Sequence, residues 1–585
     1  MSSQAASSTF RFKGVAWLAG GFFVVAVYSQ LRVQAIERKA VLNKAEKSNR
    51  FIISVTDEPR RGQILSADGK VLARDEGAYE LNIQFRKVPH SDGFFLDLGE
   101  ATGISGAEFA ELAARGDKNQ SWNAVITGEQ KRKVDSVKYR WRADGLSVKQ
   151  TGQRAYPLGY AASSLVGAFK DGSATKGLEK SLDGDLTGTK GVAKGLVDRT
   201  GAFLPMRMDG ATVKRVDGQD VELTIDSDLQ KVAADAVKKA VESNKAESGI
   251  AIVMDPKTGD ILAMSNWPTF DPVTGQGPDG KSADVNPNIM SRFEPGSTMK
   301  ILTVAKALDE GLIDDHTTVK CAGILKKGPY QVKCDSHHGN RAHGVLDPEK
   351  AIAVSCNVSA ATWALDIGFD DYHHYIEDLG LMQKCSVKLP YQVSGSMIIE
   401  PVAKPLELMC WGFGQSMGVT PLALASAFTA IGNNGVRMEP RLVKSIGGKE
   451  QPVQEGKQVF KAETAQEVLK FMEAVIDSDR GSGKTLRIPG YRLAGKTGTA
   501  ERLGRHGGGY VANFVGFVPA IQPKAMILVM VDHPQGGKYY GASVAGPVFD
   551  ELARAVIRKF AIMPSAPPVT STPKAPAVEV QVKKP

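Results

Sequence analysis

The chain has 585 residues, of which 42% are hydrophobic and 23% charged, and its formal net charge is +9 at pH 7. This composition is typical of folded globular proteins, and it excludes a collagen and a chain that is disordered over most of its length. At roughly 100–200 residues per domain the length predicts several domains, while the small positive excess without a long basic run argues against nucleic-acid binding.

The first predicted element is an uncharged segment at residues 14–31, preceded by Arg11 and Lys13. As a helix this segment spans about 27 Å, enough for the hydrocarbon core of a bilayer. A cleaved signal peptide is the alternative, because the most apolar part, residues 15–28, is short, but no small-residue cleavage site follows. We therefore predict an uncleaved single-pass anchor. Basic residues on both sides of it leave its orientation open.

Two folded parts and a tail are expected after the anchor. Residues 51–215 combine short β-like runs with one helix near residues 106–115. Residues 216–562 alternate strand and helix patterns: a hairpin at 250–254 and 261–264, a buried strand at 526–531, and helices at 230–243, 299–308, 421–431, 462–476 and 548–562. The predicted organisation is a cytoplasmic tail (1–13), a transmembrane helix (14–31), an N-terminal domain (32–215), a larger second domain (216–562) and a disordered Pro/Ala-rich tail (563–585).

Three short motifs in the second domain carry the predicted chemistry. Ser297 and Lys300 form an S-x-x-K motif at the predicted start of a helix, where backbone N–H groups and the helix dipole surround the hydroxyl and the lysine shares its helix face. The second is the S-x-N motif of Ser355 and Asn357, and the third is the K-T-G motif that begins at Lys496. Further copies look accidental: Ser173/Lys176, Ser571/Lys574, Ser121/Asn123 and the hairpin turn 257–259.

The order of these motifs is more specific than any one of them. S-x-x-K, an S-D-N-like motif and K-T-G occur in this order in penicillin-binding proteins and class A β-lactamases, and here Cys356 occupies the middle position of the second motif. No histidine lies near the motifs, so a Ser-His-Asp triad is not expected.

At these residues the sequence resembles the class B penicillin-binding proteins, and in particular the division-type, septal peptidoglycan D,D-transpeptidases. The resemblance implies an α/β penicillin-recognising fold with an antiparallel sheet flanked by helices, an elongated α+β N-terminal pedestal and one N-terminal transmembrane helix. Residues 61–64 match the beginning of the family's pedestal motif, but Ser66-Ala67 stand where the family usually has Asp-Arg. Other stretches that resemble the family are 154–157, 177–179, 186–191, 221–230, 294–300, 414–421, 495–500, 513–519 and 539–549.

The resemblance also implies roles for the motif residues. Ser297 would be acylated by a D-Ala-D-Ala stem peptide or by a β-lactam, with Lys300 as the base, its pKa lowered by burial and by Lys496. Ser355 would relay a proton to the leaving amine. The remaining expected roles are substrate binding by Asn357, Lys496, Thr497, Gly498 and Thr499, and an oxyanion hole made by the N–H groups of Ser297 and Thr499. No cofactor or metal is expected.

The implied setting is the cytoplasmic (inner) membrane, with a single span and the catalytic domain on the periplasmic or extracellular side. The expected partners are a SEDS-family glycosyltransferase and other divisome membrane proteins. An elongation or sporulation role and a non-enzymatic scaffold of the wall-synthesis complex remain alternatives. A β-lactamase would not need the large N-terminal domain, a β-lactam-sensing receptor would need several spans, and a bifunctional synthase would need a glycosyltransferase domain.

Three further patterns have weaker signals. Cys321 and Cys334 flank a predicted turn, so they either form a disulfide or remain two free thiols. Cys334, His337, His338 and His343 lack the paired spacing of zinc ligands, which favours a loop without metal. Residues 481–485 resemble the end of a phosphate-binding loop, but Ser478 replaces a required glycine and a predicted helix precedes them.

Overall fold

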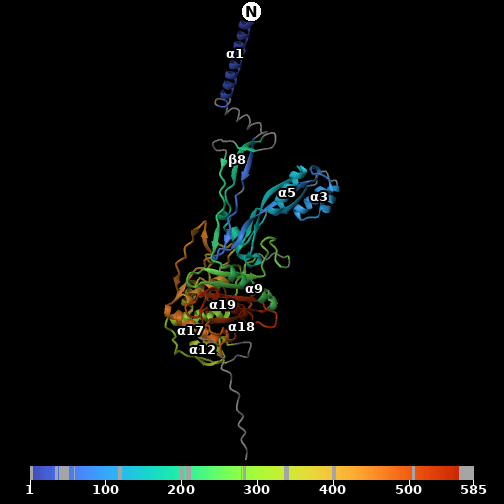
Figure 1. Ribbon diagram of the computed structural model, residues 1–585. Coiled ribbons are helices and arrows are strands. Elements are labelled where there is room, and N and C mark those ends of the chain that lie inside the picture. Colours follow the sequence, from blue (N-terminus) through green and yellow to red (C-terminus); the bar gives the residue numbers. More distant parts are fainter. Residues whose placement is uncertain are drawn as a thin grey trace, which may run out of the picture. The chain divides into compact units, whose positions relative to one another are not determined.

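The computed structural model of the protein describes residues 4–32, 34, 37, 52–57, 59–115, 121–170, 172–197, 203–205, 212–278, 280, 285–334, 342–397, 404–502 and 508–565. The chain divides into two compact units (Figure 1). The first comprises residues 1–60 and 187–218, and the second comprises residues 61–186 and 219–585. Most of the predicted C-terminal tail, with Ser571 and Lys574, lies outside the described residues.

The first unit contains one long helix and a four-stranded antiparallel sheet. Helix α1 (Gln4–Leu31) covers the predicted span at residues 14–31. Among the described residues, however, no helix has the length and apolar character needed to cross a membrane. The sheet is centred on β8, which pairs with the three other strands. Its strands are β1 (Ile52–Asp57), β8 (Gly191–Val197), β9 (Phe203–Pro205) and β10 (Thr212–Val213).

In residues 61–186 of the second unit, a long strand, β3, pairs with β4 and β5. Helices α3 and α5 begin at side-chain caps: Ser91 accepts the N–H of Phe94, and Thr127 forms a reciprocal capping box with Gln130. The elements are β2 (Ile64–Leu65), β3 (Val71–Gln84), η2 (Phe85–Lys87), α3 (Asp92–Thr102), α4 (Gly106–Ala114), β4 (Ser121–Ile126), α5 (Gly128–Trp141), β5 (Leu146–Ala155), η3 (Gly159–Ala161), α6 (Ser163–Val166), β6 (Ala168–Lys170), β7 (Ser173–Lys176), α7 (Gly177–Ser181) and α8 (Asp183–Leu186). Ser173 and Lys176 lie on strand β7.

A buried ion network joins three of the stretches that resemble the family. The Glu179 carboxylate is fully buried and accepts hydrogen bonds from Arg61 Nε at 2.6 Å and Arg154 Nε at 2.7 Å. Arg154 also donates to the carbonyl of Gly62 at 2.7 Å. The nearby departure at Ser66 leaves a hydrogen-bonded turn, because Ser66 Oγ donates to the carbonyl of Lys70. Two arginines thus neutralise one buried carboxylate and tie these segments together.

The remainder of the second unit is built on a five-stranded antiparallel sheet in the order β13-β12-β26-β25-β24. Residues of β26 alternate between two cores. Met526, Leu528 and Met530 belong to the core that contains α11, α13 and α16, whereas Ile527 and Val529 belong to the core that contains α9 and α19. Both faces of the sheet are therefore covered by helices, which explains why this strand is apolar from Ala525 to Val531. Figure 1 shows α9 and α19 next to each other.

The predicted hairpin, buried strand and five helices of this region are all confirmed, with small differences in their bounds. The helices are α9 (Ser227–Ser243), α10 (Pro287–Met290), η4 (Gly296–Thr298), α11 (Met299–Asp309), α12 (Pro348–Ala353), α13 (Asn357–Ile367), α14 (Phe369–Asp378), α15 (Lys404–Gly412), α16 (Pro421–Gly432), α17 (Ala462–Asp477), η5 (Lys484–Leu486), α18 (Gly541–Val544) and α19 (Gly546–Lys559). The strands are β11 (Val221–Leu223), β12 (Ser248–Met254), β13 (Ile261–Trp267), β14 (Val319–Cys321), β15 (Ile324–Lys327), β16 (Tyr330–Lys333), β17 (Gly344–Leu346), β18 (Ser396–Met397), β19 (Met417–Gly418), β20 (Val436–Arg437), β21 (Val443–Ile446), β22 (Lys449–Glu450), β23 (Lys457–Gln458), β24 (Ala494–Glu501), β25 (Tyr510–Val518) and β26 (Ala525–Asp532).

The ion network predicts a large stability difference between two Glu→Gln substitutions. Glu179→Gln removes the fully buried carboxylate that both arginines share and leaves each with one partly exposed partner, Asp183 for Arg61 and Asp75 for Arg154, so we expect a loss of about 3 kcal/mol in the free energy of unfolding. Glu76→Gln is the matched control, because Glu76 pairs with Arg74 at the surface, where both side chains are about half exposed, and should cost less than about 1 kcal/mol. Thermal unfolding of the two variants measures this difference. Equal shifts in both would contradict it.

Candidate active site

Ser297 lies on the short turn η4, directly before helix α11. The turn approaches strand β24 so closely that a Cβ on Gly296 would lie 3.1 Å from the Cβ of Ala500, and Gly296 itself has a φ of 55°. Glycine is required by both features, because it tolerates positive φ and leaves room for the strand. The prediction that Ser297 opens the α-helix needs correction. A 3-10 turn comes first, α11 begins at Met299, and neither element has a side-chain cap.

Lys300 lies one turn further along the chain and is buried, with 1% of its surface exposed. Its Nζ donates hydrogen bonds to three acceptors in the S-x-N motif: the carbonyl of Ser355 at 2.6 Å, Ser355 Oγ at 3.1 Å and Asn357 Oδ1 at 2.6 Å. Asn357 Nδ2 in turn donates to the carbonyl of Lys333 at 2.9 Å, which fixes the orientation of the amide. The first two predicted motifs therefore meet in space.

Lys496 is the third residue of β24 and is completely buried. Its Nζ donates to Ser355 Oγ at 2.9 Å and to the carbonyl of Thr497 at 2.8 Å. Burial lowers the pKa of Lys496 well below its usual value, and the charge of Lys300 lowers it further. The strand continues beyond the motif to Glu501.

Ser355 is the common point of the three motifs, because its hydroxyl oxygen lies within hydrogen-bond distance of both lysine amines. Its backbone has a φ of 60°, a left-handed conformation that costs a non-glycine residue about 1–2 kcal/mol. The hydroxyl can accept from the two amines and still donate its own proton. The arrangement can therefore pass a proton between two buried amines.

Further contacts fix the rest of the K-T-G motif. Ser482 and Thr497 share a hydrogen bond of 2.9 Å between their hydroxyls, and the N–H of Gly541 donates to Thr499 Oγ1 at 3.2 Å. A Cβ on Gly498 would lie 1.7 Å from Asn513 Oδ1, so no larger residue fits there. Asn513 and Gly541 lie in stretches that resembled the family, although neither was predicted as a site residue. Ser482 gave no usable signal, because its segment was considered only as a phosphate-binding loop.

The structure also shows where the predicted cysteine pair lies. Cys321 and Cys334 are free thiols, so the disulfide that the sequence left open is not formed here. The two thiols are close to each other, together with Cys356 and His343. His337 and His338 lie outside the described residues.

Known proteins share the domains and the fold of this chain. Residues 249–554 match the penicillin-binding protein transpeptidase domain, and residues 56–223 match the penicillin-binding protein dimerisation domain. The chain is 30% identical over 529 residues to stage V sporulation protein D of Bacillus subtilis, covering 87% of this chain and 79% of that protein. It is also 30% identical over 462 residues to the peptidoglycan D,D-transpeptidase FtsI of Escherichia coli, covering 78% and 76%. A crystal structure of penicillin-binding protein 3 of Mycobacterium tuberculosis with aztreonam is similar, with a TM-score of 0.65, 26% identity and coverage of 88% and 99%.

The burial of Lys496 predicts that this residue destabilises the protein at neutral pH. A lysine whose pKa is lowered by folding binds its proton more tightly in the unfolded chain, so stability rises with pH up to the unfolded pKa of about 10.4. We expect Lys496→Met to unfold at a higher temperature than the natural protein at pH 7, with the gap narrowing as the pH approaches 10. The control Lys470→Met, at an exposed ion pair, should show no such narrowing. A pH-independent gap for Lys496→Met would contradict the prediction.

Proposed function

The chain belongs to the class B penicillin-binding proteins and is a serine-type peptidoglycan D,D-transpeptidase, and from this membership we propose that Ser297 is its acylated nucleophile. The observation that supports this assignment best is the convergence of Lys300 and Lys496 on one hydroxyl, that of Ser355. Ser297 stands three residues before Lys300, so an activated serine and a proton acceptor share one turn of chain.

In the proposed acylation step, Ser297 Oγ attacks the carbonyl carbon of the penultimate D-Ala of a stem peptide. The neutral amine of Lys300 takes the hydroxyl proton. As the C–N bond to the terminal D-Ala breaks, the leaving amine receives a proton through Ser355, and an ester on Ser297 remains. A β-lactam follows the same route, except that its ring amide opens and the leaving nitrogen stays attached to the acyl group.

Strand β24 is the proposed platform for the donor peptide. Among the described strands it pairs only with β25, so its outer edge can accept an extended peptide by strand addition. Lys496, Thr497 and Thr499 would hold the terminal carboxylate. The N–H groups of Ser297 and Thr499 would stabilise the oxyanion, and Asn357 would bind a substrate amide. A bound carboxylate next to Lys496 would raise the pKa of this lysine. Substrate binding would therefore favour the protonated form of Lys496.

In the second half of the proposed reaction, the amine of a neighbouring stem peptide attacks the ester. Its extra proton returns through Ser355 and Lys300 to Ser297 Oγ, which leaves as a hydroxyl. The products are a new peptide crosslink and free enzyme. No step requires a redox change, because one amide bond is exchanged for another.

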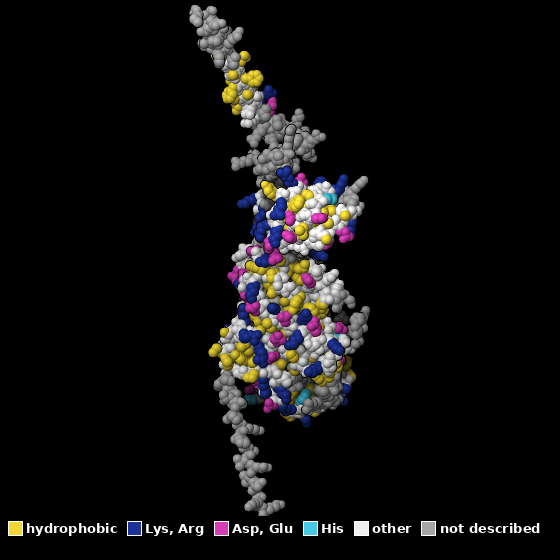
Figure 2. Space-filling model, turned by 45° about the vertical axis from the view of Figure 1, so that its right-hand side comes forward, with side chains coloured by type: hydrophobic (Ala, Val, Ile, Leu, Met, Phe, Trp, Pro, Cys, Tyr) yellow, Lys and Arg dark blue, Asp and Glu magenta, His cyan; other side chains and the backbone are white. Residues whose placement is uncertain are grey.

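We further propose that helix α1 holds the enzyme at the cytoplasmic membrane with the catalytic part outside. The support is the uncharged sequence at residues 14–31 and the exposure of its large apolar side chains, which Figure 2 shows in yellow. Trp17, Phe22 and Phe23 are 84%, 82% and 71% exposed. Such a surface is costly in water and favourable in lipid.

Septal wall synthesis is the proposed cellular role, with a SEDS-family glycosyltransferase and other divisome membrane proteins as partners. Residues 513–519 and 539–547 support it, since they resemble division-type members. Depletion in the source bacterium should give filamentous cells, which elongate but do not close their septa. Microscopy of a depletion strain is the measurement. Round, swollen cells would assign the enzyme to elongation, and a defect confined to sporulating cells would assign it to sporulation.

The nucleophile is tested by acylation with a fluorescent penicillin. We expect Ser297→Ala to lose labelling completely. Its free energy of unfolding should lie within about 0.5 kcal/mol of that of the natural protein, because the Ser297 hydroxyl caps neither η4 nor α11. Peptide mapping of the natural protein should find the adduct on Ser297 alone.

Two further variants sharpen this test. Lys300→Ala should fold and acylate at least about 100-fold more slowly, because the proton acceptor is gone. Ser173→Ala is the matched control for the S-x-x-K pattern and should label at the natural rate. An adduct on Ser173 or Ser355, or a folded Ser297→Ala protein that still labels, would overturn the assignment.

A further inference from the structure

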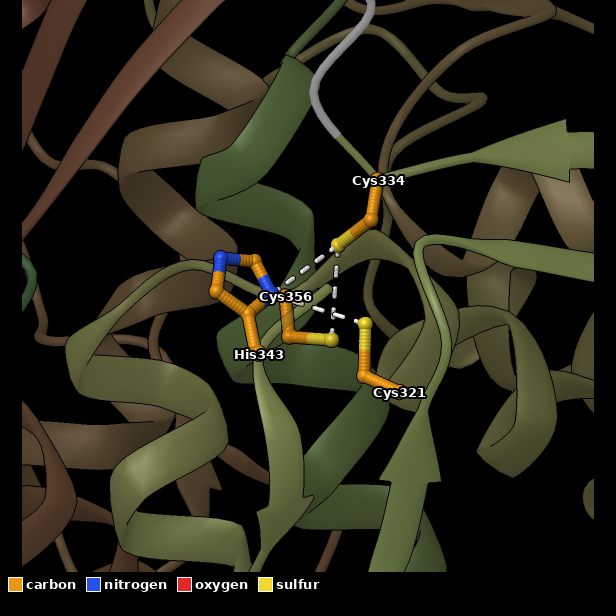
Figure 3. A group of neighbouring side chains, drawn as sticks. All are labelled: Cys321, Cys334, His343 and Cys356. Carbon is orange, nitrogen blue, oxygen red and sulfur yellow. Dashed lines mark hydrogen bonds between the residues drawn. The ribbon is translucent and has the colours of Figure 1, made fainter. Parts of the chain in front are cut away.

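Next to the S-x-N motif, four soft ligand atoms point toward one another (Figure 3). They are the Sγ atoms of Cys321, Cys334 and Cys356 and the Nδ1 atom of His343, and all lie within 4.8 Å of one another. The three cysteines are each 1% exposed, and His343 is half-buried. Cys321 ends β14, Cys334 follows β16, His343 precedes β17 and Cys356 caps α13, so four separate elements supply the group.

The distances within this group fit a tetrahedral metal ion. Cys334 Sγ lies 3.3 Å from His343 Nδ1 and 3.5 Å from Cys356 Sγ, and Cys321 Sγ lies 3.5 Å from the same Nδ1. Metal–sulfur and metal–nitrogen bonds of about 2.3 and 2.0–2.1 Å in a tetrahedron place two sulfurs about 3.8 Å apart and a sulfur and a nitrogen about 3.6 Å apart. Small movements of the side chains would bring the four atoms to these distances.

A disulfide explains this arrangement less well than a metal does. A bond between Cys334 and Cys356 would use two of the four atoms and would not explain why Cys321 and His343 lie beside them. The sulfur separation of 3.5 Å is also far from the bonded value of about 2.05 Å. Three thiolates and one imidazole form one of the usual ligand sets of structural zinc, and soft sulfur ligands disfavour magnesium and calcium.

We propose that Cys321, Cys334, His343 and Cys356 bind one Zn²⁺ ion in a closed structural site beside the catalytic centre. Backbone N–H groups already point at two of the sulfurs: Asn357 N donates to Cys334 Sγ at 3.2 Å and Ser359 N donates to Cys356 Sγ at 3.4 Å. Such donors stabilise thiolates and orient them toward a metal. This differs from the sequence-based expectation, which weighed only the Cys334–His343 loop.

The proposed site would position the S-x-N motif. Cys356 stands between Ser355 and Asn357, so a metal bond to its sulfur fixes the backbone that carries both groups contacted by Lys300. Cys334 acts on the same segment through the N–H of Asn357. The ion would touch no reacting atom, and its effect on acylation would come through the placement of Ser355 and Asn357.

Metal content of the full-length protein, purified in detergent under reducing conditions, tests the site independently of the role of Ser297. Inductively coupled plasma mass spectrometry should find about one zinc per chain. Cys321→Ser and His343→Ala, which leave the S-x-N motif unchanged, should retain less than about a tenth of it. Cys385→Ser is the matched control, a half-buried cysteine outside the group, and should keep its zinc. Cobalt substitution should give the visible bands of a tetrahedral thiolate site in the natural protein, even if a variant fails to fold.

Acylation by fluorescent penicillin tests the positioning effect. Removing the metal with a strong chelator under reducing conditions should slow acylation by about 10-fold or more, and added Zn²⁺ but not Mg²⁺ should restore the rate. A metal-free natural protein with all three thiols open to alkylation would overturn the site. A Cys334–Cys356 disulfide in protein purified without reductant would also overturn it. Unchanged acylation after complete removal of zinc would overturn the positioning effect.

Discussion

Two buried amines share one hydroxyl group, and the rest of the catalytic region maintains this arrangement. Bringing the side chains of Lys300 and Lys496 out of water is costly, and placing them near each other raises the cost if both are charged. The lowered pKa of Lys496 is the direct result. Each buried amine still donates hydrogen bonds to Ser355 and to a neighbouring carbonyl. Burial therefore disfavours the charge of the amines but does not deprive them of hydrogen-bond partners. The left-handed backbone of Ser355 adds strain at the same point. The stability of the covered sheet and its two helical layers offsets these costs.

Sequence patterns predicted the elements and the motif order but not every contact. The apolar run of β26 indicated a strand buried on both sides, which the two cores confirm. Arg61, Arg154 and Glu179 lay in three stretches that resembled the family, yet nothing in their spacing showed that they share one ion network. The sulfur group was missed for a related reason. From the sequence, Cys356 was assigned to a motif and Cys321 to a possible disulfide. The four ligand residues form one group only in the folded protein, where β14, β17 and α13 pack together.

The S-x-N motif is a junction between the lysine pair and the sulfur group. Ser355 presents two oxygens and Asn357 one to Lys300. On the other side, Cys356 and the N–H of Asn357 take part in contacts with sulfur. Three thiolates and a divalent cation would carry a net charge of −1. Such a charge beside two lysines acts against their mutual repulsion. The residue in the middle of the motif therefore has its own structural role and is more than a spacer.

The pairing of β12 with β26 has a consequence for synthesis of the chain. Ser248 lies opposite Asp532, so the centre of the sheet joins segments from the two ends of the domain. Contacts of such large sequence separation form late in folding. At a ribosomal rate of roughly 5–20 residues per second, Ser297 leaves the ribosome on the order of ten seconds or more before Lys496 follows it. The nascent chain therefore carries Ser297, the proposed nucleophile, without the lysine that completes the site, and we expect it not to react with peptidoglycan or with an antibiotic until the last strand of the sheet, β26, has been made.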